Sequence, residues 1–169
     1  FELHGGKLGK HSPRVEQWLT EASLALVNGD GGRAEGLLRQ ALKVEPDAPD
    51  LLNNLAVAYG LQGREQEAEL LMRQVHERYP DHVFARTSLA RLHLSRGEIE
   101  QADALIEPLL HRQRFHFEEF AAFCATQIQL SLAQARPEVA RSWVEMWAGV
   151  DPENPAIAQW RRRLGRGRR

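Results

Sequence analysis

The sequence has a single cysteine, Cys124, among 169 residues. One cysteine cannot form an internal disulfide, and it cannot supply a zinc site built from several thiolates. The seven histidines are not arranged as a ligand set, because His111 and His116 lie near each other without further ligands at metal-binding spacing. We therefore expect no metal and no cofactor, and we expect Cys124 to be a core residue.

Long apolar runs are also absent. No segment approaches the roughly 20 apolar residues that a membrane-spanning helix needs. The chain begins at Phe1 rather than methionine, and residues 1–11 contain no apolar stretch like the core of a signal peptide. We therefore expect a soluble domain that is a fragment of a longer protein. Its compartment stays open, with the cytoplasm favoured.

Motifs for common catalytic chemistry are missing as well. The sequence has no glycine-rich phosphate loop, no nucleophile motif and no close pair of acids on one predictable face. We therefore expect that this chain is not an enzyme.

Charge is unevenly distributed, although the formal net charge is only -1. Six arginines fall in the last nine residues: Arg161, Arg162, Arg163, Arg166, Arg168 and Arg169. Subtracting these six charges from -1 leaves -7 on residues 1–160. A cationic end can attract nucleic acid or an anionic surface. Only Trp160 is available nearby for stacking on bases, so we favour a solubilising end and keep nucleic-acid contact as the lesser alternative.

The segment from Pro49 to His82 carries the pattern around which the chain is organised. Its characteristic positions are Leu52, Leu55, Ala56, Tyr59, Gly63, Ala68, Met72, Val75 and Pro80. Small residues at Ala56 and Ala68 suit the close approach of two paired helices. Gly63 can adopt the left-handed conformation that ends the first helix. This pattern resembles the 34-residue tetratricopeptide repeat (TPR).

The same pattern recurs one repeat length before this segment and one repeat length after it. The preceding copy is Trp18, Ala22, Ala25, Gly29, Ala34, Leu38, Ala41 and Pro46. The following copy is Leu89, Ala90, His93, Gly97, Ala102, Ile106 and Leu109. A degenerate copy with Ala140, Val144, Trp147 and Pro152 aligns if about four residues are inserted. We place that insertion within Arg112 to Glu119.

The resemblance implies an all-α fold, a right-handed superhelical solenoid of antiparallel helix pairs with about four repeats plus a C-terminal capping helix. The expected divisions are a leader or linker at 1–11, repeats at 15–48, 49–82, 83–116 and 117–154, a cap at 155–165, all repeats and the cap within a domain at 12–165, and a basic tail at 166–169. No β-sheet is expected, and Ala22, Ala56 and Ala90 should be buried.

Two places should depart from regular helices. Asp30, Gly31 and Gly32 make one turn rich in glycine, so we expect the following helix to start late and fray. Pro108 falls inside a second helix, where it should kink or shorten the last turn.

TPR proteins present surfaces to other proteins, so the resemblance implies an interaction module, an adaptor or a scaffold. In this family the first helix of each repeat lines the concave face. Its sixth position is small and polar throughout: Thr20, Asn54, Ser88 and, with the insertion, Thr126. Positions two and nine add Glu16, Asp50, Phe84, Ser23, Val57, Arg91 and Gln129. We expect a partner's peptide or helix to bind at Thr20, Asn53, Asn54, Val57, Phe84, Ser88 and Arg91.

Other readings stay open at this point. Small polar residues also suit a helix face that meets only solvent. Some TPR domains clamp the acidic tails of chaperones through cations, but here the matching positions are Leu19, Ser23, Asn54, Phe84 and Ser88. Only Asn54 fits that clamp, so chaperone tails are disfavoured. The chain could instead be a regulatory or substrate-recruiting arm of a larger enzyme, or it could self-associate through its helical ends.

Overall fold

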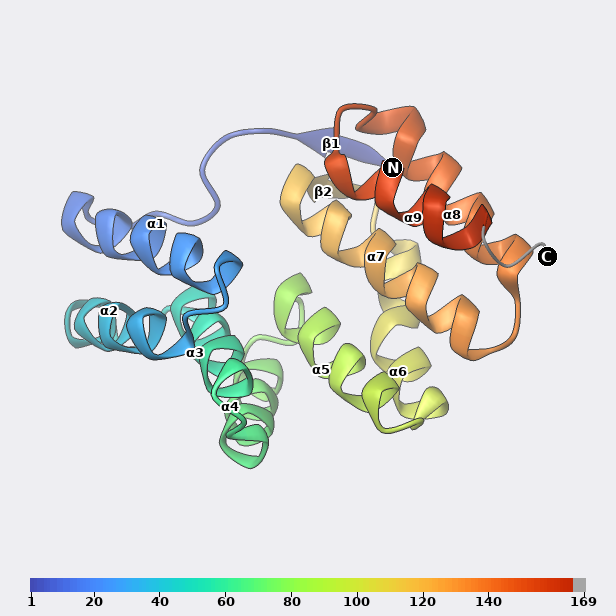
Figure 1. The fold of residues 1–169 in the computed structure, drawn as a ribbon. Coiled ribbons are helices and arrows are strands. Elements are labelled where there is room, and N and C mark those ends of the chain that lie inside the picture. Colours follow the sequence, from blue (N-terminus) through green and yellow to red (C-terminus); the bar gives the residue numbers. More distant parts are fainter. Residues whose placement is uncertain (166–169) are drawn as a thin grey trace. The chain divides into compact units, whose positions relative to one another are not determined.

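The computed structural model describes residues 1–165, and helices make up most of this part of the chain (Figure 1). The α-helices are α1 (Pro13–Val27), α2 (Gly31–Val44), α3 (Pro49–Leu61), α4 (Glu65–Arg78), α5 (Val83–Ser95), α6 (Ile99–Ile106), α7 (Phe117–Ala133), α8 (Pro137–Val150) and α9 (Pro155–Gly165). The remaining elements are the 3-10 helix η1 (Glu107–His111) and the short strands β1 (Glu2–His4) and β2 (Arg114–His116). The predicted all-α helical-repeat architecture is confirmed. The tail at 166–169 lies outside the described residues.

The chain divides into two compact units. The N-terminal unit is Lys7–Leu89, and the C-terminal unit joins Phe1–Gly6 to residues 90–165. Helix α5 contributes its first half to one unit and its second half to the other. The predicted division into repeats at 15–48, 49–82, 83–116 and 117–154 stays a prediction.

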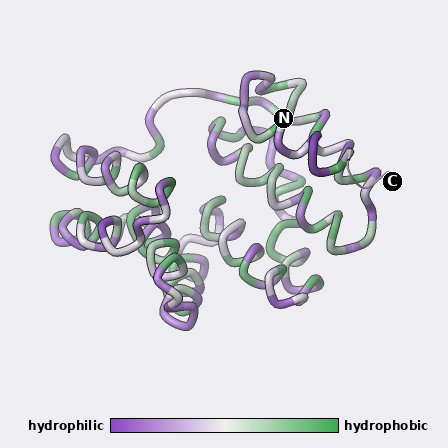
Figure 2. The backbone as a smooth tube through the Cα atoms, viewed as in Figure 1, coloured by the Kyte–Doolittle hydropathy of each residue, from purple (hydrophilic) through white to green (hydrophobic). Residues whose placement is uncertain are grey.

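In the N-terminal unit each helix packs against the next one, α1 on α2, α2 on α3 and α3 on α4. Hydrophobic and hydrophilic residues are mixed along every helix in Figure 2, so each can bury one side. Ala22 and Ala56 are fully buried, as predicted for residues where two helices come close. Gly29 and Gly63 end α1 and α3 with φ of 75° and 74°, a conformation that favours glycine.

The glycine-rich turn before α2 is better ordered than we predicted. The Asp30 carboxylate accepts a hydrogen bond from the Arg33 amide at 3.0 Å, and α2 begins directly afterwards at Gly31. A β-carbon on Gly31 would lie 2.7 Å from the carbonyl oxygen of Ala58. Gly31 is therefore the residue that lets α2 approach α3, and the prediction of a late, frayed start is wrong.

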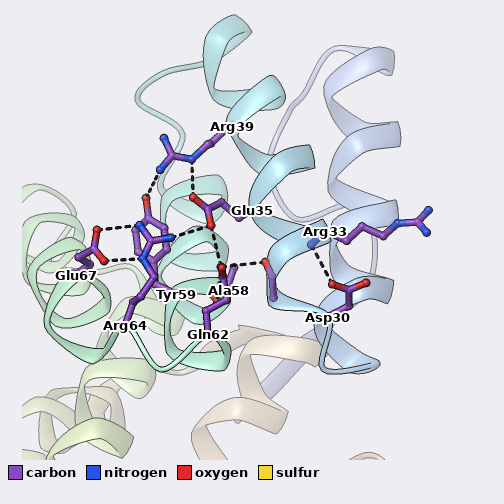
Figure 3. Close-up of polar contacts among 10 residues, drawn as sticks. Asp30, Arg33, Glu35, Arg39, Ala58, Tyr59, Gln62, Arg64 and Glu67 are labelled. Carbon is purple, nitrogen blue, oxygen red and sulfur yellow. Dashed lines mark hydrogen bonds and ion pairs between the residues drawn. The ribbon is translucent and has the colours of Figure 1, made fainter.

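A network of polar contacts also links α2 to α3 and to the turn that follows it (Figure 3). The Gln62 amide donates to the Glu35 carboxylate at 2.8 Å, and the Arg64 guanidinium donates to the same carboxylate at 2.9 Å. Arg64 also lies over the Tyr59 ring, 4.2 Å from its centre, while Arg39 donates to the Tyr59 hydroxyl at 3.0 Å. Hydrogen bonds from Gln62, Arg39 and Arg64 lower the pKa of Glu35 against the opposing effect of burial. The network ties α2 to the turn between α3 and α4.

In the C-terminal unit α7 packs against α6 and α8, and α8 packs against α9. Ala90 is fully buried, as predicted, and Trp147 is almost fully buried. Helix α6 stops at Ile106 and gives way to η1, whose second residue is Pro108. The predicted shortening at Pro108 is confirmed.

The insertion in the fourth pair takes the form of a longer helix. Helix α7 has 17 residues, whereas α3 and α5 each have 13. Four residues add slightly more than one turn and rotate the helix by only about 40°, so its apolar face is nearly kept. The extra residues therefore lie at the start of α7, in Phe117 to Phe120, which overlaps the segment Arg112 to Glu119 where we had placed them.

The segment 1–11, predicted to be a leader or linker, contains strand β1, which corrects the expectation of no β-sheet. Its role as a leader or linker stays a prediction. Strand β1 pairs with β2 in parallel, so the described chain contains one small β-sheet that we did not expect. The centre of the Phe1 ring lies 5.3 Å from that of Phe120, and the His116 imidazole bonds the Gly6 carbonyl at 2.8 Å. These contacts hold the segment against residues in the second half of the chain. A local sequence pattern does not indicate contacts between such distant segments.

The end of this segment is fixed on the N-terminal unit by His11. One ring nitrogen lies 2.5 Å from a Glu45 oxygen, and the other lies 2.5 Å from an Asp50 oxygen. Burial opposes a charge on His11, but the hydrogen bonds to Asp50 and Glu45 outweigh burial and raise its pKa. The segment is thus anchored at both ends.

Candidate interaction surfaces

The predicted row at the sixth position is only partly a surface. Thr20 on α1 is exposed, and its hydroxyl donates to the Glu16 carbonyl of the same helix at 2.9 Å. Asn54 on α3 and Ser88 on α5 are half-buried. Thr126 on α7 is fully buried, with its hydroxyl donating to the Ala122 carbonyl at 2.8 Å. Thr126 is therefore a core residue and not a continuation of the row.

Asn53 and Asn54 have different environments although they are neighbours. Successive helical residues point about 100° apart, and Asn53 is only 4% exposed. Its amide nitrogen donates to the Ser88 hydroxyl at 3.4 Å, while its buried side-chain oxygen has no hydrogen-bond partner. Asn53 thus lies between α3 and α5, where its amide holds Ser88. Its part in partner binding stays a prediction.

The Asn54 amide is a polar group available to a partner in the N-terminal unit. Within residues 1–165 it makes no hydrogen bond, and it is half-buried beside solvent. Val57, one turn further along α3, is also half-buried, and so is Phe84 at the start of α5. The Phe84 ring lies 5.9 Å from the His82 ring. These helices therefore present one free amide together with partly exposed apolar side chains.

Arg91, the remaining predicted residue, lies in the C-terminal unit and lines a pocket of about 410 Å³. The lining comes from three helices: Arg91, Leu94 and Ser95 from α5, Gln129, Leu132 and Ala133 from α7, and Arg163 from α9. Each of the lining residues from α7 has a counterpart from α5 at the same sequence spacing, which is one repeat length plus the insertion. The pocket is therefore built from equivalent positions of α5 and α7, and Arg163 of α9 completes its lining.

The two arginines of this pocket are exposed. Among residues 1–165 neither Arg91 nor Arg163 has a carboxylate partner. The Arg163 guanidinium lies 5.1 Å from the centre of the Trp160 ring. By contrast, Arg161 on the same helix is paired with Glu145 at 2.6 Å.

Sequence reasoning named Arg91 and Gln129 but missed Leu94, Leu132 and Arg163. Leu94 and Leu132 lie one helical turn beyond the ninth position, so extending the predicted row by one turn could have found them. Arg163 was assigned to a solubilising end, and only its place on α9 brings it to the pocket.

Other chemistry finds little support in the described part of the chain. Residues 1–165 contain no group of three or more potential metal ligands. Cys124 is fully buried as predicted, and burial raises the pKa of its thiol. Within the same residues no helix combines the length and the apolar character needed to cross a bilayer.

Two models of the tetratricopeptide repeat match the sequence, one over residues 19–83 and the other over residues 61–126. Together they span residues 19–126, more than half of the chain. The chain belongs to the tetratricopeptide repeat family. TPR domains are generally protein-protein interaction modules, and both matching models are repeat models without a catalytic domain. Comparison with curated protein sequences gives no match for this TPR chain.

Solved structures share the TPR fold at low sequence identity. The Sgt2 TPR domain from Aspergillus fumigatus is 20% identical, with 78% of this chain and 84% of that chain covered and a TM-score of 0.57. The pilF protein of Pseudomonas aeruginosa is 17% identical, with 89% and 67% covered and a TM-score of 0.66. A mutant O-GlcNAc transferase from Thermobaculum terrenum is 18% identical, with 84% and 27% covered and a TM-score of 0.62. At these identities the likeness is one of fold.

Proposed function

We propose that this TPR protein is a non-enzymatic adaptor that binds a peptide or helix of a partner protein along α1, α3 and α5, the expected concave groove. The observation that carries the proposal is the Asn54 amide, which is half-buried and free of hydrogen bonds within the described residues. A polar group in that setting has both its donor and its acceptor available to a ligand. Membership of a family of interaction modules supports the same conclusion.

The neighbouring side chains suggest how the partner is held. Asn54 can donate to one peptide carbonyl and accept from one peptide amide. Val57 and Phe84 offer apolar surface for side chains of the partner. Ser88 is held by Asn53, so that its hydroxyl keeps a fixed place beside this surface.

A partner must first be recovered with the wild-type chain and purified, after which affinities can be measured. We expect the Asn54→Ala variant to bind that partner about fivefold more weakly, because one hydrogen bond contributes about 1 kcal/mol. The melting temperature should not change, since Asn54 makes no internal hydrogen bond. Gln74→Ala on α4 is the matched control, an exposed amide that should leave affinity unchanged. If Asn54→Ala binds the partner as tightly as the wild type does, the groove proposal is wrong.

The alternative of an enzyme's recruiting arm gains no specific observation. The chain spans 27% of the transferase that it resembles, and the resemblance is at 18% identity. Contact with nucleic acid through the basic end keeps only the charge argument, because residues 166–169 lie outside the described part.

A further inference from the structure

We propose that the pocket between α5, α7 and α9 binds an acidic segment of the partner, in which an aspartate or glutamate stands beside an aliphatic residue. This inference rests on the proposed function, since it names the class of peptide that the interaction module would accept. It concerns the C-terminal unit alone and needs no contact with Asn54.

The first argument is the pair of uncompensated arginines. Arg91 and Arg163 enter the same pocket from α5 and α9, and neither has a carboxylate partner among residues 1–165. By contrast, Arg161 in this unit is paired with Glu145, and Arg112 with Glu119 at 3.0 Å. A guanidinium presents a planar set of donors that matches a carboxylate in two parallel hydrogen bonds. The pocket therefore contains two guanidinium groups that are each available to bind a carboxylate.

The C-terminal ends of three helices lie around the pocket, and their partial negative charges oppose the positive charges of the two arginines. Ser95 and Ala133 are the last residues of α5 and α7, and Arg163 lies in the last turn of α9. Each helix C-terminus carries about half a negative charge, and its effect falls off within one turn. Three such ends offset much, but not all, of the two full positive charges. The pocket therefore stays positive only while both arginines are present.

The second argument is the floor between the two arginines. Leu94 and Leu132 are half-buried and supply apolar surface, and Ala133 leaves room beside them. The Gln129 amide can donate to and accept from a peptide backbone. A volume of about 410 Å³ lies within the roughly 300–1,000 Å³ of small-ligand pockets. An acidic side chain with an aliphatic neighbour satisfies both the charge and the apolar floor.

The same lining argues against nucleic acid at this site. Sequence-tolerant binding of single strands uses aromatic side chains on which bases stack. The residues that line the pocket include no aromatic ring, and the nearby Trp160 ring is already in contact with the Arg163 guanidinium. The aliphatic floor favours peptide side chains over bases.

The test uses the full chain and a fluorescently labelled eight-residue peptide of alternating glutamate and leucine, with binding followed by anisotropy. A second peptide with glutamine in place of glutamate tests the charge. We expect the acidic peptide to bind at least about tenfold more tightly than the glutamine peptide, and Arg91→Gln and Arg163→Gln each to weaken the acidic peptide by about tenfold. Arg162→Gln, the adjacent exposed arginine outside the pocket lining, is the matched control and should change affinity less than twofold.

Several results would overturn the inference. The first two are equal affinity for the two peptides and no binding of the acidic peptide by the wild type at about 1 mM. The third is an equal loss of affinity in the Arg162→Gln and Arg163→Gln variants. The fourth is a single-stranded oligonucleotide that binds more tightly than the acidic peptide and is weakened by both Arg91→Gln and Arg163→Gln. The two proposals fail separately. If the purified partner loses affinity with Asn54→Ala while the arginine variants leave both partner and acidic peptide unchanged, the pocket inference is wrong and the groove proposal stands. If the arginine variants weaken binding of the partner and of the acidic peptide while Asn54→Ala leaves partner affinity unchanged, the groove proposal is wrong and the pocket inference stands.

Discussion

Replacing Gly31 with alanine tests the close approach of α2 to α3. Alanine is ordinarily a better helix residue than glycine by about 1 kcal/mol, so the sequence alone predicts that Gly31→Ala stabilises α2. The structure predicts the opposite. The new β-carbon would lie 2.7 Å from the Ala58 carbonyl oxygen and 3.0 Å from the Leu61 β-carbon and the Gln62 γ-carbon.

The size of the effect follows from two opposing contributions. Two of the three close atoms are not free to move away, because the Ala58 carbonyl is backbone within α3 and the Leu61 β-carbon is fixed to it. Forcing extra atoms into a packed contact costs about 1–3 kcal/mol, whereas the gain in helix propensity is at most about 1 kcal/mol. Gly31→Ala should therefore lower the free energy of unfolding by up to about 2 kcal/mol.

Gly36→Ala in the same helix is the control, because a β-carbon at Gly36 meets no atom within 4 Å. It should raise the free energy of unfolding by about 0.5–1 kcal/mol. Urea unfolding followed by circular dichroism should separate the two variants by about 1–3 kcal/mol, or several degrees in a thermal melt. If Gly31→Ala proves as stable as Gly36→Ala, the close packing of α2 against α3 is wrong.

Three further predictions concern the core and the N-terminal anchor. Ala56→Leu should lower the free energy of unfolding by about 1–3 kcal/mol, because Ala56 is fully buried where α3 meets its neighbours, and an unchanged melt would contradict that packing. Asp50 and Glu45 raise the folded-state pKa of His11, so the stabilisation from protonated His11 is complete below pH of about 6.5 and is lost as the pH rises through the folded pKa. Urea unfolding of the wild type and of His11→Asn from about pH 5.5 to 9 should show a difference in stability that shrinks as the pH rises. A difference that stays constant with pH would refute this prediction. Cys124 should react with a thiol reagent only in denaturant, since its burial disfavours the thiolate, and fast labelling of the native chain would show that it is accessible.

The sequence by itself predicted the helix pairs, because their determinants are local or repeat at a constant spacing. Ala22, Ala56 and Ala90 recur once in every repeat length and are all fully buried, and glycines at the same spacing end α1 and α3. A helix can be identified from its own residues, and its partner follows after one short turn. Even the shortening of α6 was predictable, since the effect of proline on a helix is local.

Which side of a helix stays exposed was decided only by tertiary packing. Asn53 and Asn54 are identical in type, yet a rotation of about 100° buries one against Ser88 and leaves the other free. At the glycine-rich turn the local propensity pointed to fraying, but the approach of the Ala58 carbonyl made Gly31 a necessary packing residue. Propensity describes one helix, whereas packing depends on what lies against it.

Contacts between distant segments were likewise beyond the sequence pattern. Strand β1 pairs with β2 from the other half of the chain, and His11 finds its two carboxylates at the end of α2 and the start of α3. The pocket of Arg91 and Arg163 needs α5, α7 and α9 together. Periodicity reports which residues share a face of one helix, but it carries no information on which distant residues meet that face, and only the folded chain supplies it.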